Sequence, residues 1–307
     1  MANVYKYSWF DDDIIETKNA KVSITSSAVL YGLSVYTVFP VCIGKKGEWY
    51  AFRLDEHYKR LCNSARIIGI DTFEPKWDFA KFEQTVKKLV LKNEITKDVF
   101  VRVTVHVTAE VAGTKSRGLE TDLSMFIYDA NTILPKEGGR LKTSVWRRIP
   151  DYAIPSRAKV NGAYVNSVLA KQDALDSGYD DCIFLDVNGH VCELSAANIF
   201  IVREGKLLTP DTTSDLLEGI NRKSVIEFAS EDLGVNVVER QLDLTELYIA
   251  DEVFASGTSA NIASIHEIDG RKINGGKTGE ITKKIQKAHY DLLHGSYPDR
   301  HRWLTEI

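Results

Sequence analysis

A chain of 307 residues with a formal net charge of -4 is long enough for one large or two medium domains, but it lacks the positive charge that would hold nucleic acid or anionic lipid. Hydrophobic residues make up 44% of the chain and charged residues 27%, which is typical of a globular protein. Three aspartates at 11–13 stand where a signal peptide needs an apolar run, and no apolar run approaches the roughly 20 residues of a membrane span, so neither is expected.

Residues 1–130 are expected to form a small α+β domain. Helices are predicted over 55–67, with Asp55 as the N-cap, and over 77–93, because apolar side chains recur there at helical spacing. Strand patterns rich in β-branched and aromatic residues are found at 4–10, 13–24, 35–43, 48–53, 98–109 and 123–128.

A proline and two glycines mark residues 131–139 as an interdomain linker, and residues 140–307 are expected to form a larger, mostly β domain. Its clearest hairpin signal is Asn188-Gly189 between two apolar runs. Strands are predicted over 141–148, 181–187, 190–193, 199–203, 206–208, 235–240 and 252–255, a hairpin over 265–273, and helices over 166–177, 222–233, 244–250 and 279–294.

The cysteines and histidines show no local ligand pattern. The seven histidines are scattered, and no Cys-x-x-Cys pair occurs among Cys42, Cys62, Cys182 and Cys192. We therefore expect buried thiols, a cytoplasmic location and no metal site.

Lys159 stands between the apolar residues Ala158 and Val160 in a connection before a predicted helix. If the fold buries this side chain, desolvation disfavours the ammonium and lowers its pKa. A neutral lysine can attack a carbonyl carbon and form a Schiff base. A solvated surface lysine is the alternative, so Lys159 is a candidate nucleophile that needs support from other residues.

Support for this candidate comes from a carboxylate and from anion-binding loops. Glu193 follows the Asn188-Gly189 turn in an apolar strand, where a carboxylate is costly unless it is paired, for instance with a protonated ring nitrogen. Residues 217–221 lead into a predicted helix with Asn221 as the N-cap and Gly219 in a tight turn, and free amides at a helix start suit a phosphate.

Residues 256–260 form a loop of small side chains after a strand, which also suits an anion, and Arg60 on a predicted helix would add a cation. A water-facing glutamate, an ordinary helix cap, a polar loop and a solvated arginine are the alternative interpretations. Together with Tyr164, these residues supply what pyridoxal phosphate needs: an amine, an acid for its ring nitrogen and anchors for its phosphate.

The sequence resembles the fold-type IV (class IV) pyridoxal-phosphate aminotransferases, and it is most similar to the branched-chain amino acid aminotransferases. The matching blocks are 31–35, 57–61, 158–164, 166–171, 178–180, 185–189, 198–200, 207–210, 250–254 and 303–304, so the resemblance covers almost the whole chain. It implies a small α+β domain and a larger pseudo-barrel α/β domain with the cofactor between them. It also implies a homodimer in which a loop of one subunit reaches the other's site.

By this resemblance, Lys159 would be the catalytic residue and would hold the cofactor as an internal aldimine. Tyr164 would hydrogen-bond the ring hydroxyl oxygen, Glu193 would pair with the pyridine nitrogen, Asn198 would orient Tyr164, and Leu217 would lie against the ring. The phosphate would be held by Arg60, Ile220, Asn221 and Thr258, with Gly219 and Gly257 as further cofactor contacts. The substrate side would be lined by Tyr31, Tyr36, Val38, Arg102, Gly257, Thr258 and Ser259.

Residues 36–40, Tyr-Thr-Val-Phe-Pro, differ from the Phe-Glu-Gly-Ile-Arg usual in the branched-chain enzymes and are closer to the D-amino acid and (R)-amine aminotransferases. Val38 in place of glycine should narrow the pocket. Arg102 matches an arginine used for dicarboxylates, although Phe100 replaces the usual tyrosine, and Arg117 is either a further carboxylate reader or a solvated loop charge. Glu218, Asn221 and Ala197 also depart from the usual residues.

The resemblance implies ping-pong transfer of an amino group between a branched-chain or related aliphatic L-amino acid and 2-oxoglutarate. The alternatives are a D-amino acid or (R)-amine aminotransferase, an enzyme similar to aminodeoxychorismate lyase, and a non-catalytic binding scaffold of the same fold.

Overall fold

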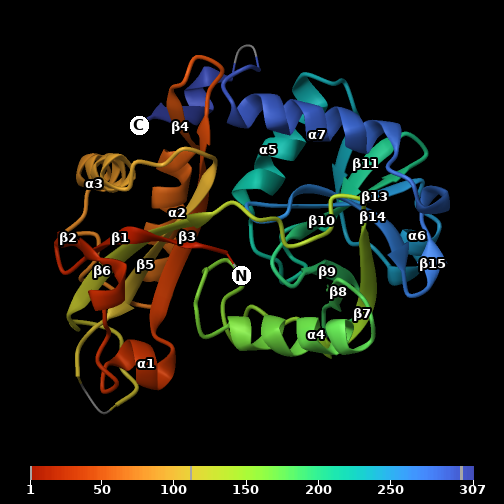
Figure 1. Ribbon diagram of the computed structural model, residues 1–307. Coiled ribbons are helices and arrows are strands. Elements are labelled where there is room, and N and C mark those ends of the chain that lie inside the picture. The colour runs from red at the N-terminus through yellow and green to blue at the C-terminus, as the bar shows by residue number, and fades with distance from the viewer. Residues whose placement is uncertain (1, 111–112, 298–299) are drawn as a thin grey trace. The chain divides into compact units, whose positions relative to one another are not determined.

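The computed structural model describes residues 2–110, 113–297 and 300–307 (Figure 1). The chain forms two compact units: unit 1 comprises residues 1–131, 158–162 and 291–307, and unit 2 comprises residues 132–157 and 163–290. Lys159 therefore belongs to unit 1, although the residues on either side of its segment belong to unit 2. The domain boundaries expected from the sequence stay a prediction.

Unit 1 is built on a seven-stranded sheet in the order β16-β4-β3-β5-β6-β1-β2. Every neighbouring pair in this sheet is antiparallel. The strands are β1 (Val4–Phe10), β2 (Asp13–Glu16), β3 (Ser34–Ile43), β4 (Trp49–Phe52), β5 (Val99–Val107), β6 (Thr121–Asp129) and β16 (Leu304–Glu306). Strand β3, which lies between β4 and β5, is buried over nearly its whole length, as its mostly apolar sequence requires.

Helices α2 (Leu54–Ile67) and α3 (Phe79–Lys92) bury amphipathic faces in unit 1, and a short α1 (Ser27–Tyr31) precedes β3. Phe39 of β3 lies 5.6 Å from the ring of His57 and 6.4 Å from that of Phe82, so both longer helices contact the same strand. The expected cap at Asp55 is wrong: the N-cap of α2 is Arg53, with φ 48, and Asp55 lies in the first turn. A carboxylate there is favourable to the helix dipole, which explains the misleading signal.

Unit 2 contains a nine-stranded sheet in which β10, β13, β14, β7, β8 and β9 follow one another and β9 pairs again with β10, so that the sheet closes on itself. Strands β11 and β12 extend it from β10, and β15 pairs with β14. The strands are β7 (Gly139–Arg147), β8 (Asp181–Leu185), β9 (Val191–Leu194), β10 (Asn198–Arg203), β11 (Lys206–Thr209), β12 (Val237–Glu239), β13 (Glu252–Gly257), β14 (Asn261–Ile268) and β15 (Arg271–Lys272).

The helices that follow are α4 (Tyr164–Asp176), α5 (Ile220–Glu231), α6 (Leu244–Tyr248) and α7 (Glu280–Leu293). Helix α4 lies along β7 and β8 (Figure 1), where Ala170 and Ala174 pack against Phe184 and two buried cysteines. The core of the closed sheet consists of aliphatic side chains, among them Ile183, Val191, Ile199, Ile201, Val253 and Ile265. In the described part of the chain, no helix has the length and apolar character needed to cross a membrane.

Three further predictions of secondary structure are wrong. The strand expected over 13–24 ends at Glu16, because residues 17–19 form a 3-10 turn in which the Thr17 hydroxyl donates to the Tyr5 carbonyl at 2.9 Å. Helix α5 begins at Ile220 with Gly219 as its N-cap, so Asn221 lies inside the first turn rather than at the cap. Strand β14 begins at Asn261, four residues earlier than predicted, and the sequence did not predict β16.

Glu246 on α6 carries the clearest acid-sensitive ion pair of unit 2. Its carboxylate accepts hydrogen bonds from Arg240 at 2.6 Å, Arg203 at 3.0 Å and the Asp243 N–H at 3.2 Å. The hydrogen bond from Arg240 lowers the pKa of Glu246 to about 2 from an ordinary value of 4.5. Because the folded-state pKa is depressed, this contribution to stability is complete above the ordinary pKa and is lost as the pH falls toward 2.

We predict that Glu246→Gln lowers the unfolding temperature at pH 7 and that the difference from the parent protein shrinks between about pH 5 and pH 2. Calorimetry over this pH range measures both quantities. Glu137→Gln, at an exposed carboxylate, is the control and should leave the unfolding temperature unchanged. A difference that stays constant with pH would contradict the role of the ionised carboxylate.

Candidate active site

The segment that carries Lys159 is bound to β3 and α2 of unit 1. Val160 forms a β-bridge with Val35, and the Lys159 carbonyl accepts a hydrogen bond from the Tyr36 N–H at 3.0 Å. The Lys159 N–H donates to the Ser64 hydroxyl of α2 at 3.1 Å. A Cβ on Gly32 would lie 3.0 Å from the Gly162 Cα, so the segment can approach this closely only beside glycine.

The side chain of Lys159 is brought to two residues that the sequence assigned to the substrate side. Its Nζ lies 4.8 Å from the centroid of the Tyr36 ring, and the guanidinium carbon of Arg102 lies 3.7 Å from the same centroid. Val38 is the direct β-sheet partner of Arg102 and is buried. Two cations on one aromatic ring place an amine close to a group that can bind a carboxylate.

Arg60 on α2 contributes a third cation to this part of unit 1. Its Nη2 donates to the Thr37 hydroxyl at 3.4 Å, and Thr37 also hydrogen-bonds His57 Nδ1 at 2.8 Å. Burial lowers the pKa of His57 well below its ordinary value, and the positive charges of Arg60, Lys159 and Arg53 lower it further. His57 is therefore neutral at neutral pH and adds no charge.

Tyr31, a further residue that the sequence assigned to the substrate side, is half exposed. Its hydroxyl accepts a hydrogen bond from the Gly113 N–H at 3.0 Å.

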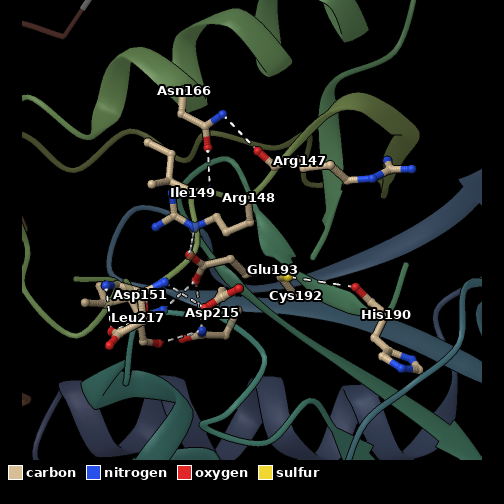
Figure 2. A network of polar contacts seen from close by, with 12 residues as sticks. Arg147, Arg148, Ile149, Asp151, Asn166, His190, Cys192, Glu193, Asp215 and Leu217 are labelled. Carbon is tan, nitrogen blue, oxygen red and sulfur yellow. Dashed lines mark hydrogen bonds and ion pairs between the residues drawn. The ribbon is translucent and has the colours of Figure 1, made fainter. Parts of the chain in front are cut away.

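Glu193 on β9 is the centre of a buried polar network in unit 2 (Figure 2). Its carboxylate lies 3.0 Å from Arg148 Nε, 3.2 Å from Asn198 Nδ2 and 3.3 Å from the Leu217 N–H. The Glu193 and Arg148 side chains are only 8% and 11% exposed. The ion pair and the two hydrogen bonds compensate the cost of burying a carboxylate, so Glu193 is not the water-facing glutamate of the alternative interpretation.

Asn198 connects Glu193 to the loop before α5. It is the β-sheet partner of Glu193 in the closing pair of strands, and its Nδ2 also donates to the Leu217 carbonyl at 2.9 Å. A Cβ on Gly219 would overlap the Asn198 side-chain oxygen, so only glycine fits at this N-cap. Glu193, Asn198, Leu217 and Gly219 thus lie together in unit 2.

The start of α5 and the end of β13 contain buried polar atoms without a partner among the described residues. The side-chain oxygen of Asn221 and the hydroxyl of Ser256 are both in this state, and these residues are only 4% and 0% exposed. Helix α5 also has no side-chain cap. Unsatisfied buried polar atoms are rare, and beside an uncapped helix start they indicate a site for an anion.

Four other predicted residues of unit 2 are neighbours of Asn221 or Ser256 in the sequence, and Tyr164 lies on another helix. Ile220 is buried in the first turn of α5, and Gly257 ends β13 directly after Ser256. Thr258 and Ser259 follow, and the Ser259 carbonyl accepts a hydrogen bond from the Ile133 N–H at 3.0 Å. Tyr164 is the first residue of α4.

Sequence reasoning missed Arg148 and Asn161, whereas Ser256 belongs to the loop 256–260 that the sequence predicted to suit an anion. Arg148 ends a predicted strand as one of two adjacent arginines, and only the fold distinguishes it from its exposed neighbour Arg147. Asn161 accepts a hydrogen bond from Arg102 at 2.5 Å. A polar residue two positions from a candidate catalytic lysine is a signal that could have drawn attention to it.

A mixed group of ligand-type side chains lies elsewhere in unit 1. The ligand atoms of Cys42, Asp98 and His294 are all within 4.8 Å of one another. His294 Nε2 lies 3.0 Å from Asp98 Oδ2, while burial raises the pKa of the Cys42 thiol and keeps it protonated. These residues are too far apart in the sequence to form a motif, which is why the sequence did not indicate the group.

Comparisons with known proteins show which family the chain belongs to. The family model described as amino-transferase class IV matches residues 34–268. A probable branched-chain-amino-acid aminotransferase of Aquifex aeolicus (strain VF5) is 36% identical over 303 residues, which are 98% of this chain and 96% of the relative. The branched-chain-amino-acid aminotransferase of Escherichia coli (strain K12) is 34% identical over 98% of this chain and 97% of its own length.

Solved structures are similar over nearly the full length. A branched-chain aminotransferase from Thermoproteus uzoniensis, crystallised with norvaline, has a TM-score of 0.93 at 34% identity and 99% coverage of both chains. The branched-chain amino acid aminotransferase from Thermobaculum terrenum in its PLP-form has a TM-score of 0.91 at 31% identity, with 99% of this chain and 98% of that chain covered.

The chain therefore belongs to the class IV aminotransferase family. It is a pyridoxal-phosphate-dependent transaminase with the fold-type IV architecture, so the family resemblance, the fold class and the cofactor expected from the sequence are confirmed.

The described residues fit this cofactor chemically. Unit 2 offers a buried carboxylate for a protonated ring nitrogen. The partnerless side-chain oxygen of Asn221 at the uncapped start of α5 and the partnerless hydroxyl of Ser256 on β13 suit a phosphate site. The amide of Asn221 can present its nitrogen in place of its oxygen, since the two are interchangeable by a flip. Unit 1 offers the amine of Lys159 beside Tyr36.

We predict that Arg148→Met lowers the free energy of unfolding by about 3 kcal/mol, because the Glu193 carboxylate would stay buried without its cation. Urea unfolding of the holoenzyme measures this change. Adding Glu193→Gln to the same protein should recover part of the loss, because no buried charge then remains unpaired. Arg147→Met, at the exposed neighbour, is the matched control; an equal loss in this variant would contradict the role of the buried pair.

Proposed function

We propose that this enzyme transfers the amino group between a branched-chain or related aliphatic L-amino acid and 2-oxoglutarate. The observation that carries the proposal is that Lys159 Nζ and the Arg102 guanidinium share the Tyr36 ring, at 4.8 Å and 3.7 Å. This arrangement places an amine for carbonyl chemistry near a cation for a substrate carboxylate. The names of the relatives, which are branched-chain aminotransferases, support the same substrate class.

Pyridoxal phosphate, when bound, supplies a carbonyl that accepts the amino group and a ring that withdraws electrons from the reacting carbon. We assign Lys159 to hold the cofactor, and its amine to take the α-proton of the substrate and return it. Glu193 would keep a proton on the ring nitrogen, and Arg148 would hold the Glu193 carboxylate in place at 3.0 Å.

The remaining cofactor contacts follow the family pattern residue by residue. Tyr164 would hydrogen-bond the ring hydroxyl oxygen with Asn198 orienting it, and Leu217 would lie against the ring. The phosphate would be held by Arg60, Ile220, Asn221 and Thr258, with Gly219 and Gly257 close to it, and we add Ser256 because its buried hydroxyl has no partner in the described part of the chain. On the substrate side we assign Tyr31, Tyr36, Val38, Arg102 and Ser259.

A D-amino acid or (R)-amine aminotransferase is the second candidate function. The observation that favours it is the pair Tyr36 and Val38 on β3, both buried and both different from the usual lining of branched-chain enzymes. A bulky side chain at Val38 limits how large a substituent fits beside Arg102, its partner across the sheet.

Two further proposals concern the protein in its cell. All four cysteines are free and buried, which supports a reducing compartment such as the cytoplasm. We also propose a homodimer. Helix α4 exposes apolar side chains at helical spacing, namely Val165 at 63%, Val168 at 65% and Leu169 at 40% exposure, and a second copy of this chain would cover them.

The assignment of function predicts that the purified holoenzyme converts L-leucine with 2-oxoglutarate faster than D-alanine or (R)-1-phenylethylamine with a keto acceptor. Lys159→Ala should lower turnover by at least about a thousandfold, because the proton-transferring amine is lost. Borohydride should fix the cofactor on the peptide that contains Lys159, as detected by mass spectrometry. Lys136→Ala, at an exposed lysine, is the control. Absence of L-leucine turnover would contradict the substrate class, and an active Lys159→Ala enzyme would contradict the role of the lysine.

The dimer predicts a mass in solution of twice the 34.5 kDa chain, which light scattering after size-exclusion chromatography measures. Val168→Glu should shift the protein toward the monomer, because it places a charge in the apolar face of α4. Val187→Glu, at a side chain that is 53% exposed outside this helix, should leave the mass unchanged. A monomeric parent protein would rule the proposal out.

A further inference from the structure

Arg102 carries a positive charge that no described carboxylate neutralises. The contacts of its side chain are the Tyr36 ring, 3.7 Å from its guanidinium carbon, and the Asn161 side-chain oxygen, 2.5 Å from Nη2. The nearby His106 does not add an anion, because burial, followed by the charge of Arg102, lowers the pKa of that histidine to about 4 and leaves it neutral. A partly buried guanidinium without an acidic partner is suited to a ligand carboxylate.

Asn161 is itself fixed before it reaches Arg102. Its Nδ2 donates to the Ser34 hydroxyl at 2.8 Å, and its backbone N–H donates to the Ser34 carbonyl at 3.0 Å. Because an arginine can only donate, the Asn161 oxygen must face Arg102 and the nitrogen must face Ser34. The amide is thus held at both ends and offers the guanidinium one orientation.

The same short segment carries Lys159 two residues earlier, where the Lys159 carbonyl is bound to the Tyr36 N–H at 3.0 Å. This stretch of backbone is therefore held beside Tyr36. It carries the Lys159 amine, and through Asn161 it also holds the Arg102 guanidinium, which lies on the same Tyr36 ring as that amine. One Nη2 hydrogen bond leaves further N–H donors of Arg102 for a carboxylate, which arginine binds best with two parallel bonds.

We propose that Asn161 is a positioning residue that sets the preference of this enzyme for dicarboxylate ligands. By fixing the guanidinium of Arg102 against Tyr36, it keeps the remaining donors ready for the second carboxylate of a substrate such as 2-oxoglutarate. A monocarboxylate with an apolar chain makes no use of this group. The inference rests on the proposed function for its choice of substrates, but its test measures binding and needs no turnover.

The test is calorimetric titration of the holoenzyme with 2-oxoglutarate and with 4-methyl-2-oxopentanoate, in the absence of an amino donor. Asn161→Ala should weaken binding of 2-oxoglutarate by about tenfold, because the guanidinium loses its fixed orientation and a hydrogen bond to a charged group is lost. The affinity for 4-methyl-2-oxopentanoate should change much less. Equal weakening for both keto acids would indicate a general structural role and overturn the proposal.

A second variant tests the charge of the Arg102 guanidinium instead of its orientation. It also replaces Asn161→Ala if that variant does not fold. Asn161→Asp keeps an oxygen for Arg102 but neutralises its charge, so 2-oxoglutarate should again bind more weakly while 4-methyl-2-oxopentanoate does not. A double-mutant cycle with Arg102→Ala completes the test: in that background, Asn161→Ala should cause no further loss for 2-oxoglutarate. A full additional loss would show that Asn161 does not act through Arg102.

Asn63→Ala is the matched control, because Asn63 accepts a hydrogen bond from Arg66 at 3.2 Å on the exposed part of α2 and the substitution removes a bond of the same kind elsewhere in unit 1. It should leave both affinities unchanged. The two proposals fail in different ways. A wild-type enzyme that does not turn over L-leucine contradicts the proposed function, whereas an unchanged ratio of the two keto-acid affinities in Asn161→Ala contradicts the positioning role.

Discussion

The pairing of β9 with β10 is the constraint on which unit 2 depends. It closes the nine-stranded sheet on itself, and the two residues that face each other in this closing pair are Glu193 and Asn198. A buried carboxylate at such a place would oppose closure unless donors surrounded it. Arg148 supplies an ion pair, and Asn198 and the Leu217 N–H supply hydrogen bonds. The network that stabilises the closed sheet therefore also contains the acid that we assign to the cofactor (Figure 2).

In unit 1, the contacts that attach the segment 158–162 also position two side chains that we assign to the active site. Residues 158–162 belong to it although the chain on both sides belongs to unit 2, and they are attached by a β-bridge and by hydrogen bonds to β3 and α2. The amine of Lys159 and the guanidinium of Arg102 both contact one ring, that of Tyr36. A substitution at this tyrosine would therefore act together on the amine that we assign to the cofactor and on the guanidinium that we assign to a substrate carboxylate.

The residues that we assign to the substrate side depart from the family pattern on β3, at Tyr36 and Val38, whereas Lys159, Tyr164 and Glu193 match it. Both departures lie on a strand whose side chains are almost all buried, so they change the shape of a rigid wall. A family of one fold can in this way vary its substrates while Lys159, Tyr164 and Glu193 remain in place.

The sequence by itself determined the family, the cofactor and most of the helices and strands, since blocks such as 158–164 and the Asn188-Gly189 turn carry their meaning locally. It could not distinguish Arg148 from Arg147, predict the caps at Arg53 and Gly219, or show that Asn161 meets Arg102, 59 residues away. Those features depend on which side chains each sheet buries and which segments become neighbours. Burial and long-range pairing are properties of the folded chain, and only the tertiary structure decides them.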